Sequence, residues 1–436
     1  MSNNKSFIRA WYWYDWAVSA FTTTIITVLI GPYLTTITKA ASINGFVDVM
    51  GIKIFADSFV PYVISISVIL QVFLLPYIGT ISDKSNKKEN LFAITGLGGG
   101  IFASLMYFIK DDNFLFGGAL LLISNLLYGC SMVIYNSYLN DISEEHERDK
   151  ISSRGYAYGY LGGGLLLALN LALISNAESL GISTGFAVRI SLASAGIWWF
   201  IFALIPIRKL RGLEARPQIP SNESYLTAFI NTIKELPKYP QTLIFLLAYI
   251  FYNDGIQAVI VVSSQFGQEA LGLDISVLTT VILMVQFVAF LGAIIFEKIS
   301  KITSTKTSLT ATIVIWIVAI LYAYFFLNSE GGFYILGAVI GLVLGGSQAL
   351  SRSLFSILIP KGKEGEFYGI YEISERGTSW IGPLLFGLSL QFTSSYKFAI
   401  LSLAILFVIG LLFLLKVDFK KGANDVGNSI SNNITA

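Results

Sequence analysis

Apolar stretches of about 20 residues recur along this chain, and they decide what it can fold into. A helix rises 1.5 Å per residue, so about 20 apolar residues cross the roughly 30 Å hydrocarbon core of a bilayer. Of the 436 residues, 54% are hydrophobic and 13% are charged, and the mean hydropathy of +0.69 exceeds that of soluble domains. The sequence therefore predicts a multi-pass protein whose main partner is a lipid bilayer. A membrane β-barrel is not expected, because its strands would be about 10 residues long and would alternate in polarity, whereas the apolar runs of this chain are longer and uninterrupted.

The number of apolar runs predicts twelve transmembrane helices. The runs are centred near residues 24, 70, 100, 124, 165, 197, 253, 286, 318, 345, 380 and 406. The first run contains Asp15 and lacks a cleavage site, so we expect a retained helix and not a signal peptide. We expect an all-α membrane protein with six-helix halves at 1–207 and 241–418, a proline-rich cytoplasmic linker at 208–240 and a cytoplasmic tail at 419–436.

Lysine and arginine residues in the loops set the expected orientation, because cytoplasmic loops carry an excess of positive charge. With the N-terminus inside, the outer loops receive only Lys39, Lys53, Lys110 and Lys397, and the inner loops receive about five times as many basic residues. We therefore expect both termini in the cytoplasm.

The two halves also resemble each other. The stretches "GCSMVIYNSYLNDISEEHERDKI" from Gly129 and "GGSQALSRSLFSILIPKGKEGEF" from Gly345 both start with small residues and carry a polar residue seven positions on, Asn136 and Arg352 respectively. Both continue through a charged loop into a further apolar run. A parallel repeat of six helices, with the pathway between the halves, is the plan of major facilitator transporters.

The loop after the second run reads "GTISDKSNKKEN". It matches the loop signature of the major facilitator superfamily through Gly79, Asp83, Lys84, Lys87 and Lys88, which we interpret as a gating loop. An acid at this place could cap the N-terminus of a neighbouring helix or pair across a moving interface. The alternative, plain positive-inside charge, accounts for the lysines but not for the acid.

Three charges lie at the start of the eleventh run, in "GIYEISERGTSWIGPLLF" at 369–386. Each charge costs about 2.5 to 3.5 kcal/mol at the centre of a membrane helix, so Glu372, Glu375 and Arg376 should face protein or water. Their spacing places them on one helix face, and Glu372 and Arg376 have the favoured order for an ion pair. In the alternative, the span begins near Thr378 and these charges lie in cytoplasmic water.

A polar group also interrupts the seventh run, where "YIFYNDGIQAV" places Asp254 about a dozen residues into the span. An acid at that depth is a candidate functional residue, and we expect it to exchange a proton between access states. Asp15 occupies the related first helix, either in the pathway or at the interface among tryptophans. The expected substrate or proton pathway comprises Asp15, Asn253, Asp254, Gln257, Gln348, Arg352, Glu372, Glu375 and Arg376.

Several kinds of chemistry are not supported. Cys130 is the single cysteine and His146 the single histidine, so we expect no disulfide and no metal site. The chain has no phosphate-binding Gly-Lys-Ser/Thr loop, no HExxH and no GxSxG motif. We expect no cofactor, no nucleic-acid partner and no enzymatic activity.

Longer blocks carry a more specific resemblance. The stretches "YDWAVSAF", "YGYLGGG", "YNDGIQAV", "FGQEALGL" and "GGSQALSRSLFSILIPKGKEGEFYGIYEISERGTSWIGPLLFG" resemble the unknown major facilitator family, which includes the fungal autophagy-related vacuolar amino-acid effluxers. The resemblance makes Glu372 and Arg376 the family's acid and base. The chain departs from the pattern at Val18, where Asn is common, at Asn140, where Pro is common, and at Glu375, where a small residue is usual.

The resemblance implies a secondary active transporter that works by alternating access on a small-molecule substrate, with amino acids or related metabolites as candidates and a proton as candidate coupling ion. We expect a monomer in the cytoplasmic (inner) membrane of a bacterium. The alternative is a membrane receptor or scaffold that uses the same helix bundle without transport. Buried charges in the seventh and eleventh runs argue against it, because a scaffold gains nothing from them.

Overall fold

The computed structural model describes residues 2–56, 59–84, 88–211, 213, 227, 230–231, 234–376, 381–393 and 395–428. The first half of the chain forms α1 (Ser2–Ala20), the π-helix η1 (Phe21–Leu29), α2 (Ile30–Ala40), β1 (Phe46–Val49), β2 (Ile52–Phe55), α3 (Phe59–Lys84), α4 (Lys88–Ser104), η3 (Leu105–Phe108), α5 (Phe114–Ile142), η4 (Glu145–Glu147), α6 (Arg148–Ser175) and α7 (Thr184–Leu210). The second half forms η5 (Leu236–Lys238), α9 (Pro240–Leu271), α10 (Ile275–Ile302), α11 (Thr305–Phe325), α12 (Glu330–Ile357), α13 (Glu364–Arg376), α14 (Ile381–Thr393), α15 (Tyr396–Ser402), α16 (Ala404–Lys416) and α17 (Phe419–Asp425).

The apolar runs are helices, as predicted. Within the described residues, eleven helical stretches are long and apolar enough to cross a membrane, and Ile381–Leu390 is a shorter apolar helix. The predicted eleventh run contributes α13 and α14, separated by residues 377–380, which lie outside the description. Large apolar side chains such as Phe73 and Leu169 are exposed on the outer faces of the bundle, where lipid would cover them. The prediction of an all-α membrane protein is confirmed.

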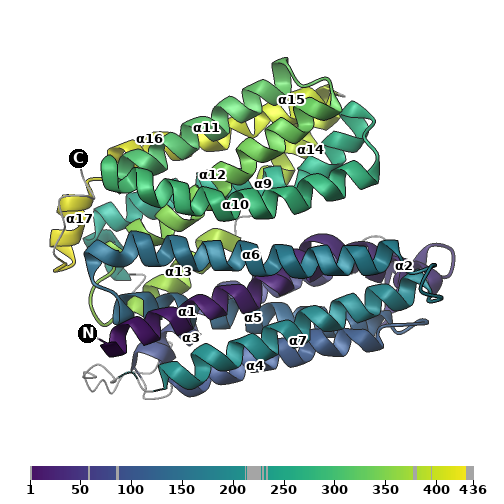
Figure 1. Cartoon of the computed structure of the whole chain (residues 1–436), viewed down its shortest axis with the longest axis horizontal. Helices are drawn as coiled ribbons and strands as arrows, with labels where there is room; N and C mark the ends of the chain where they lie inside the picture. The colour runs from purple at the N-terminus through teal and green to yellow at the C-terminus, as the bar shows by residue number, and fades with distance from the viewer. Residues whose placement is uncertain are drawn as a thin grey trace.

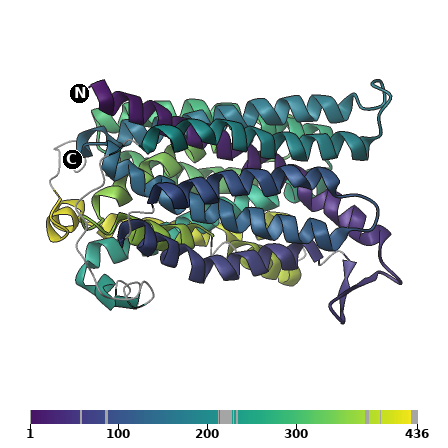
Figure 2. The same cartoon turned by 90° about the horizontal axis from the view of Figure 1, so that it is seen from below.

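The helices form two bundles that lie side by side. Figure 1 shows helices α1 to α7, coloured purple to teal, in one bundle and the green and yellow helices of the second half in the other, with α13 lying against α3 and α5 of the first bundle. Both termini lie at the same end. Figure 2, the view from below, shows the same end for both termini and the β1–β2 hairpin at the opposite end. We call these the terminal end and the hairpin end. The shared end agrees with the expectation that both termini lie on one side of the membrane.

The hairpin is an element that the apolar runs do not predict. Strands β1 and β2 pair antiparallel, with Val49 opposite Ile52. Met50 and Gly51 between them have φ angles of 55° and 87°, the left-handed conformation that a two-residue hairpin turn requires. The Asp48 side chain accepts a hydrogen bond of 2.8 Å from the Gly51 amide and closes the turn.

Small residues bring α10 and α12 into backbone contact. A Cβ atom on Gly345 would lie 2.0 Å from the Ala289 carbonyl oxygen, and one on Gly292 would lie 2.1 Å from the Leu342 carbonyl oxygen. Close helix contacts of this kind need glycine, because lipid supplies no hydrophobic force that draws helices together. They fix α12, which carries the most deeply buried cation of the described structure, Arg352.

The predicted tail begins as part of the folded bundle. Helix α17 packs against α9 and α12, and the Asn428 side-chain amide donates to the carbonyl oxygens of Ile357 at 2.7 Å and Ile359 at 3.0 Å. These bonds satisfy the carbonyl group of the last residue of α12, which has no partner within the helix, and a second carbonyl two residues beyond it.

Candidate functional site

A buried ion pair joins the two bundles. Arg352 on α12 has no exposed surface, and its Nη2 atom lies 3.2 Å from Oδ2 of Asp15 on α1, whose side chain is 6% exposed. The guanidinium also donates from Nε to Ser152 Oγ at 2.9 Å and from Nη2 to the Ser152 carbonyl oxygen at 2.8 Å. Because Ser152 lies on α6, the second-half cation is held by two first-half helices.

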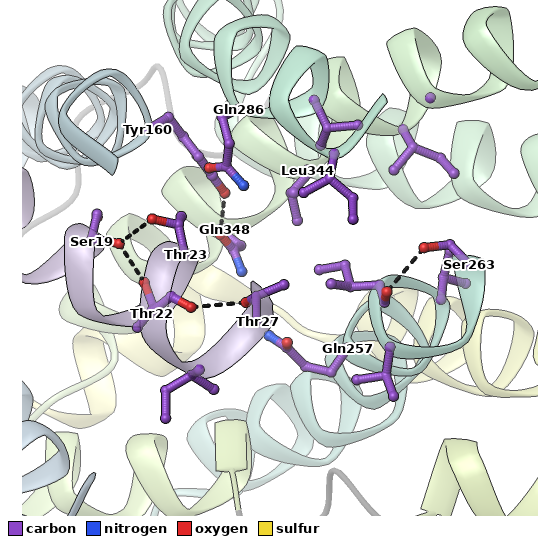
Figure 3. Close-up of a pocket in the computed structure, with 18 of the residues that line it drawn as sticks. Ser19, Thr22, Thr23, Thr27, Tyr160, Gln257, Ser263, Gln286, Leu344 and Gln348 are labelled. Atoms are coloured by element: carbon purple, nitrogen blue, oxygen red, sulfur yellow. Dashed lines mark hydrogen bonds between the residues drawn. The ribbon is translucent and has the colours of Figure 1, made fainter. Parts of the chain in front are cut away.

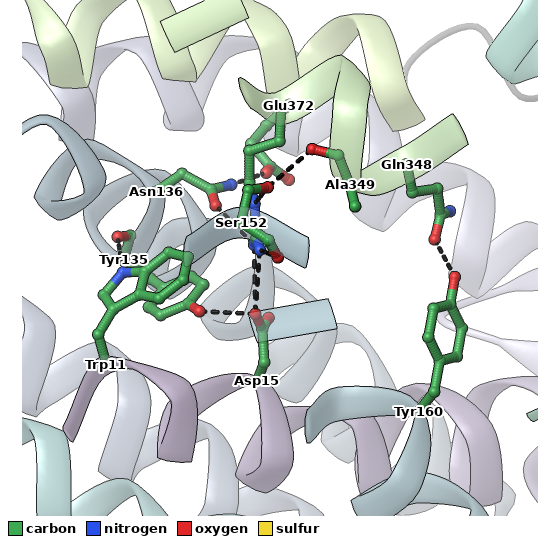
Figure 4. Close-up of polar contacts among 10 residues, drawn as sticks. Trp11, Asp15, Tyr135, Asn136, Ser152, Tyr160, Gln348, Ala349 and Glu372 are labelled. Carbon is green, nitrogen blue, oxygen red and sulfur yellow. Dashed lines mark hydrogen bonds and ion pairs between the residues drawn. The ribbon is translucent and has the colours of Figure 1, made fainter. Parts of the chain in front are cut away.

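Aromatic groups surround this pair (Figure 4). The Tyr135 hydroxyl donates to Asp15 Oδ2 at 2.6 Å, and the Trp11 indole donates to the Tyr135 carbonyl oxygen at 2.9 Å. The Arg352 guanidinium lies 4.1 Å from the centre of the Tyr156 ring. Stacking on an aromatic face is a further favourable contact for a weakly hydrated guanidinium, so the charge is compensated on several sides.

A second inter-bundle contact adjoins the first. The Asn136 amide on α5 donates to Oε1 of Glu372 on α13 at 2.7 Å, while its oxygen accepts a weak bond from Arg352 Nη1 at 3.4 Å. Glu372 has no exposed surface, so the alternative that places it in cytoplasmic water is wrong. The predicted pairing of Glu372 with Arg376 lies outside the described residues, because the Arg376 side chain is not part of the description.

Further bonds close the gap between the bundles toward the terminal end. Asn140 Nδ2 and Arg148 Nη1 both donate to the Ser356 carbonyl oxygen, at 3.1 and 2.9 Å. Asp149 on α6 accepts hydrogen bonds from the hydroxyls of Ser353 on α12 and Thr305 on α11. We call the inter-bundle contacts of Asp15, Asn136, Asn140, Arg148, Asp149 and Ser152 the terminal-end gate.

The acid of the loop signature caps a helix of the opposite bundle. Asp83, near the end of α3, accepts hydrogen bonds of 2.8 Å from the amides of Gly365 and Glu366, in the first turn of α13. A carboxylate at this place satisfies orphan amides and complements the positive end of the helix dipole. Gly79 permits the approach, because a Cβ atom there would lie 2.2 Å from the Gly365 carbonyl oxygen.

Lys88, a basic residue of the same loop, makes no such contact with the opposite bundle among the contacts described. Lys88 pairs with Asp141 at 2.7 Å and lies over the Tyr138 ring, so its contacts stay within the first bundle. Lys87 and the side chain of Lys84 lie outside the described residues. The described cross-bundle contacts of this loop are therefore those of Gly79 and Asp83.

A cavity of about 820 Å³ lies between the bundles. Its lining includes Asp15, Gln348 and Glu375 on the gate side, and it continues to Phe333, near the start of α12 at the hairpin end. Asp15 thus belongs both to the cavity and to the terminal-end gate. The gate therefore lies directly next to the cavity, on the side of the terminal end, in the space between the two bundles.

Hydroxyl and amide groups supply most of the polar lining. Figure 3 shows Ser19, Thr22, Thr23, Thr27, Tyr160, Gln257, Ser263, Gln286 and Gln348 around the cavity. The Tyr160 hydroxyl on α6 donates to Gln348 Oε1 on α12 (Figure 4), so a neutral bond joins the bundles beside the cavity. Lys, Arg and His are absent from the described lining residues.

A π-helix shapes one wall of this cavity. Residues of η1 continue α1, and Thr23 and Thr27 donate through their hydroxyls to the carbonyl oxygens of Ser19 and Thr22, each at 2.8 Å. Such side-chain bonds compete with the helical ladder, and π-helical segments are frequent at functional sites. These threonines were not among the pathway residues predicted from the sequence. The run "TTT" inside an apolar segment is the signal that could have found them.

The seventh-run residues take separate places on α9. Gln257 lines the cavity, but Asn253 and Asp254 are absent from the described lining. The Asn253 amide donates to the Glu375 carbonyl oxygen at 3.2 Å, near the end of α13. Asp254 is 1% exposed. Of the predicted pathway residues whose side chains are described, Asp15, Gln257, Gln348 and Glu375 line the cavity, and Arg352 and Glu372 lie in the gate.

Comparisons with known proteins agree on one family. Residues 3–427 match the family model described as "Vacuole effluxer Atg22 like". The chain is 30% identical over 411 residues to "Uncharacterized MFS-type transporter YxiO" of Bacillus subtilis, with 93% of each chain covered. It is 24% identical to "Autophagy-related protein 22-1" of Aspergillus niger, over 86% of this chain and 75% of that relative.

Solved structures share the architecture at low sequence identity. The proton:xylose symporter XylE matches with a TM-score of 0.72 at 14% identity, with 97% of each chain covered. The transporter FucP in its outward conformation matches with a TM-score of 0.65 at 12% identity, over 95% of this chain and 98% of that one. The predicted major facilitator fold is thereby confirmed.

Proposed function

Since the chain belongs to the Atg22-like family and is therefore a multi-pass transporter of the major facilitator superfamily, we propose that it moves a small solute by alternating access through the cavity between its bundles. The observation that carries the proposal is the position of Asp15, which lines the cavity and also pairs with Arg352 across the gate. A solute that enters the cavity therefore meets a group that holds the bundles together.

The transport cycle requires that the gate open. In the described state the inter-bundle bonds of the gate lie between the cavity and the terminal end. Passage toward that end needs Arg352 to leave Asp15 and Glu372 to leave Asn136. Water or a new partner can replace each broken bond. The barrier therefore depends mainly on the charged pairs, because their separation leaves buried charges uncompensated until water or a new partner reaches them. If the terminal end is cytoplasmic, as the positive charges predict, this state faces outward.

Amino acids or related metabolites are the solutes that we propose. A cavity of about 820 Å³ is large enough for such molecules. Its hydroxyl and amide groups can donate to a carboxylate and accept from an ammonium group. The description of the matching family model, "Vacuole effluxer Atg22 like", supports solute efflux, and the resemblance to the fungal amino-acid effluxers suggests the solute class. We propose that the protein acts as a monomer in the bacterial cytoplasmic membrane.

We propose a proton gradient as the energy source. The chain lacks the phosphate-binding loop that ATP hydrolysis would need. A carboxyl group buried in the membrane domain can carry a proton from one side to the other as access alternates. Asp254 has the required burial.

Metabolite profiling followed by reconstitution tests this function. Cells with and without the chain are compared by untargeted metabolite analysis, and amino acids whose internal level changes are labelled and tested in proteoliposomes. We expect flux that depends on the protein and rises when a pH gradient is imposed. A pure receptor or scaffold would show no protein-dependent flux of any amino acid, and this result would overturn the proposal.

Labelling tests the orientation. In a chain with Cys130 replaced, a cysteine at Ser85 should react with a membrane-impermeant maleimide only from the cytoplasm, because lysines surround it. A cysteine at Asn113, in the loop before α5, should react only from outside. The reverse pattern would place the terminal end, and with it the gate, on the outer side.

The helix cap by Asp83 gives a second expected result. Asp83→Asn keeps one acceptor but loses the charge that complements the α13 dipole, a loss of about 0.5 to 2 kcal/mol for the gate-closed state. We expect normal expression, a severalfold lower flux, and faster maleimide labelling of a cysteine at Ser356. Asp141→Asn is the matched control, because the bond of Asp141 to Lys88 stays within one bundle. Unchanged flux and labelling in Asp83→Asn would reduce the loop to positive-inside charge.

A further inference from the structure

No hydrogen bond of normal geometry reaches the carboxyl group of Asp254 from the described residues. It is 1% exposed, and both of its oxygens are buried without a hydrogen-bond partner. The backbone amide of Gly382, at the start of α14, is a donor close to the carboxyl group, but its contact with either oxygen does not have the length and angle of a normal hydrogen bond. A bare carboxylate in such a place costs several kcal/mol, so the group needs a positive charge or a proton.

The described surroundings of Asp254 do not suit a metal cation as the source of positive charge. A Cβ atom on Gly382 would lie 2.3 Å from Ala258 Cβ and 3.3 Å from Asp254 Oδ2, and Gly255 packs on the Phe407 ring. These neighbours are apolar, whereas a hard metal cation takes several oxygen ligands. The described residues contain no group of three His, Cys, Asp or Glu side chains that could hold a metal ion. A proton needs one oxygen only.

No described charged side chain competes for this carboxyl. Helix α14 contains no charged residue, and the side chain of Glu375, on α13, lines the cavity. The Tyr252 hydroxyl on α9 itself is hydrogen-bonded to Ser351 of α12. Among the described groups, Asp254 is therefore isolated electrostatically.

Asp254 is also connected to the moving parts of the proposed cycle. Its neighbour Asn253 donates a hydrogen bond from its side-chain amide to the Glu375 carbonyl oxygen, near the end of α13. This bond ties α9 to α13. Helix α13 carries Glu372 and, at its N-terminus, the two amides that Asp83 caps. Helix α9 thus touches α14 through Asp254 and α13 through Asn253, one residue apart.

We propose that Asp254 is the proton-binding site of the transporter, separate from the solute cavity, and that its charge state is passed to the gate through α13 and α14. This inference rests on the proposed transport function. The bound proton neutralises Asp254 while α14 packs on it. Loss of the proton creates a buried charge that only movement of α14, or entry of water, relieves.

Thermal unfolding of the purified full chain tests this site without any solute. Asp254→Asn copies the protonated acid, whereas the aspartate of the unfolded chain ionises above about pH 4. The unfolding midpoint of Asp254→Asn should therefore exceed that of the unmodified chain by a few °C more at pH 8.5 than at pH 5.5. Asp112→Asn, an exposed acid in the turn before α5, is the control and should follow the unmodified chain at both pH values. A constant difference between Asp254→Asn and the unmodified chain would overturn the proposal.

Exchange of sodium chloride for choline chloride identifies the ion. We expect no change of the midpoint at either pH. Stabilisation of the unmodified chain by sodium at pH 8.5, absent in Asp254→Asn, would overturn the proton assignment and make the site a sodium site.

A chemical measurement on the unmodified chain covers the case in which Asp254→Asn does not fold. Dicyclohexylcarbodiimide, an apolar reagent, reacts with protonated carboxyl groups. Mass spectrometry should find it on Asp254 at pH 7, less on Asp254 at pH 9, and not on Asp112. An unmodified Asp254 at pH 7 would overturn the proposal. These measurements need no solute flux. A negative result here would therefore count against the proton site, whereas the absence of flux in proteoliposomes would count against the transport function.

Discussion

Asp15→Asn alone should destabilise the protein more than Asp15→Asn combined with Arg352→Gln. The single change leaves Arg352, which has no exposed surface, without its carboxylate partner. Removing one member of a buried ion pair costs about 3 to 5 kcal/mol, whereas replacing both members is often nearly neutral. Ser152 and the Tyr156 ring remain as contacts of the guanidinium, but neither carries a negative charge.

The measurement is a double-mutant cycle on purified protein. Unfolding midpoints of the unmodified chain, the two single variants and the double variant give the coupling energy between the two sites. The matched control is the cycle of Lys88 and Asp141, a pair within one bundle whose side chains are 19% and 14% exposed. We expect a smaller coupling there, because solvent screens the pair. Additive effects at Asp15 and Arg352 would show that the pair does not hold the gate.

The sequence predicted the helices well because the bilayer fixes their length and polarity. Runs of about 20 apolar residues must be helical in lipid, where every backbone group needs an internal partner. The β1–β2 hairpin lies outside this constraint, and its short strands carry no membrane signal. The π-helical turn of η1 depends on threonine bonds to Ser19 and Thr22 that a count of apolar residues does not register.

Several residues proposed from the sequence for the pathway lie at the cavity or the gate, but their partners across the two bundles were not predicted. Helical spacing suggested Glu372 with Arg376, and Asp15 was left between the pathway and the interface. In the structure Asp15 pairs with Arg352, 337 residues away, and Glu372 pairs with Asn136, 236 residues away. Spacing along one helix reports local neighbours only, whereas these pairs are set by packing of the two bundles. Because a buried charge is costly, the sequence predicted that these residues have partners. It did not predict which residues the partners are.

A side chain at position 79 should open the gate without touching any of its charges. The Gly79 site on α3 has no room, since a Cβ atom would lie 2.2 Å from the Gly365 carbonyl oxygen and 2.6 Å from its carbon. The obstructing atoms belong to the backbone of α13 and cannot rotate away. Gly79→Val must therefore separate α3 from α13 or distort one of them, at a cost of about 1 to 3 kcal/mol or more.

The separation also breaks the cap on α13. Asp83 reaches the Gly365 and Glu366 amides at 2.8 Å only while the two helices stay close. We therefore expect Gly79→Val to lose both the packing and the cap, and to shift the protein toward the gate-open state more strongly than Asp83→Asn does. Cysteine labelling at Ser356 reports the opening, and flux should fall to a small fraction of that of the unmodified chain.

Gly31→Ala is the matched control for this change. Gly31 lies on α2, and a Cβ atom there meets nothing within 4 Å, so alanine should be neutral or stabilise the helix by up to about 1 kcal/mol. Gly79→Ala adds the smallest possible side chain and should lie between the control and Gly79→Val in labelling rate and flux. The graded order follows from the volume added at one backbone contact. Equal labelling of Gly79→Val and Gly31→Ala, with equal flux, would mean that α3 and α13 do not hold the terminal end closed, and the gate would then consist of the buried Asp15–Arg352 pair and its neighbours alone.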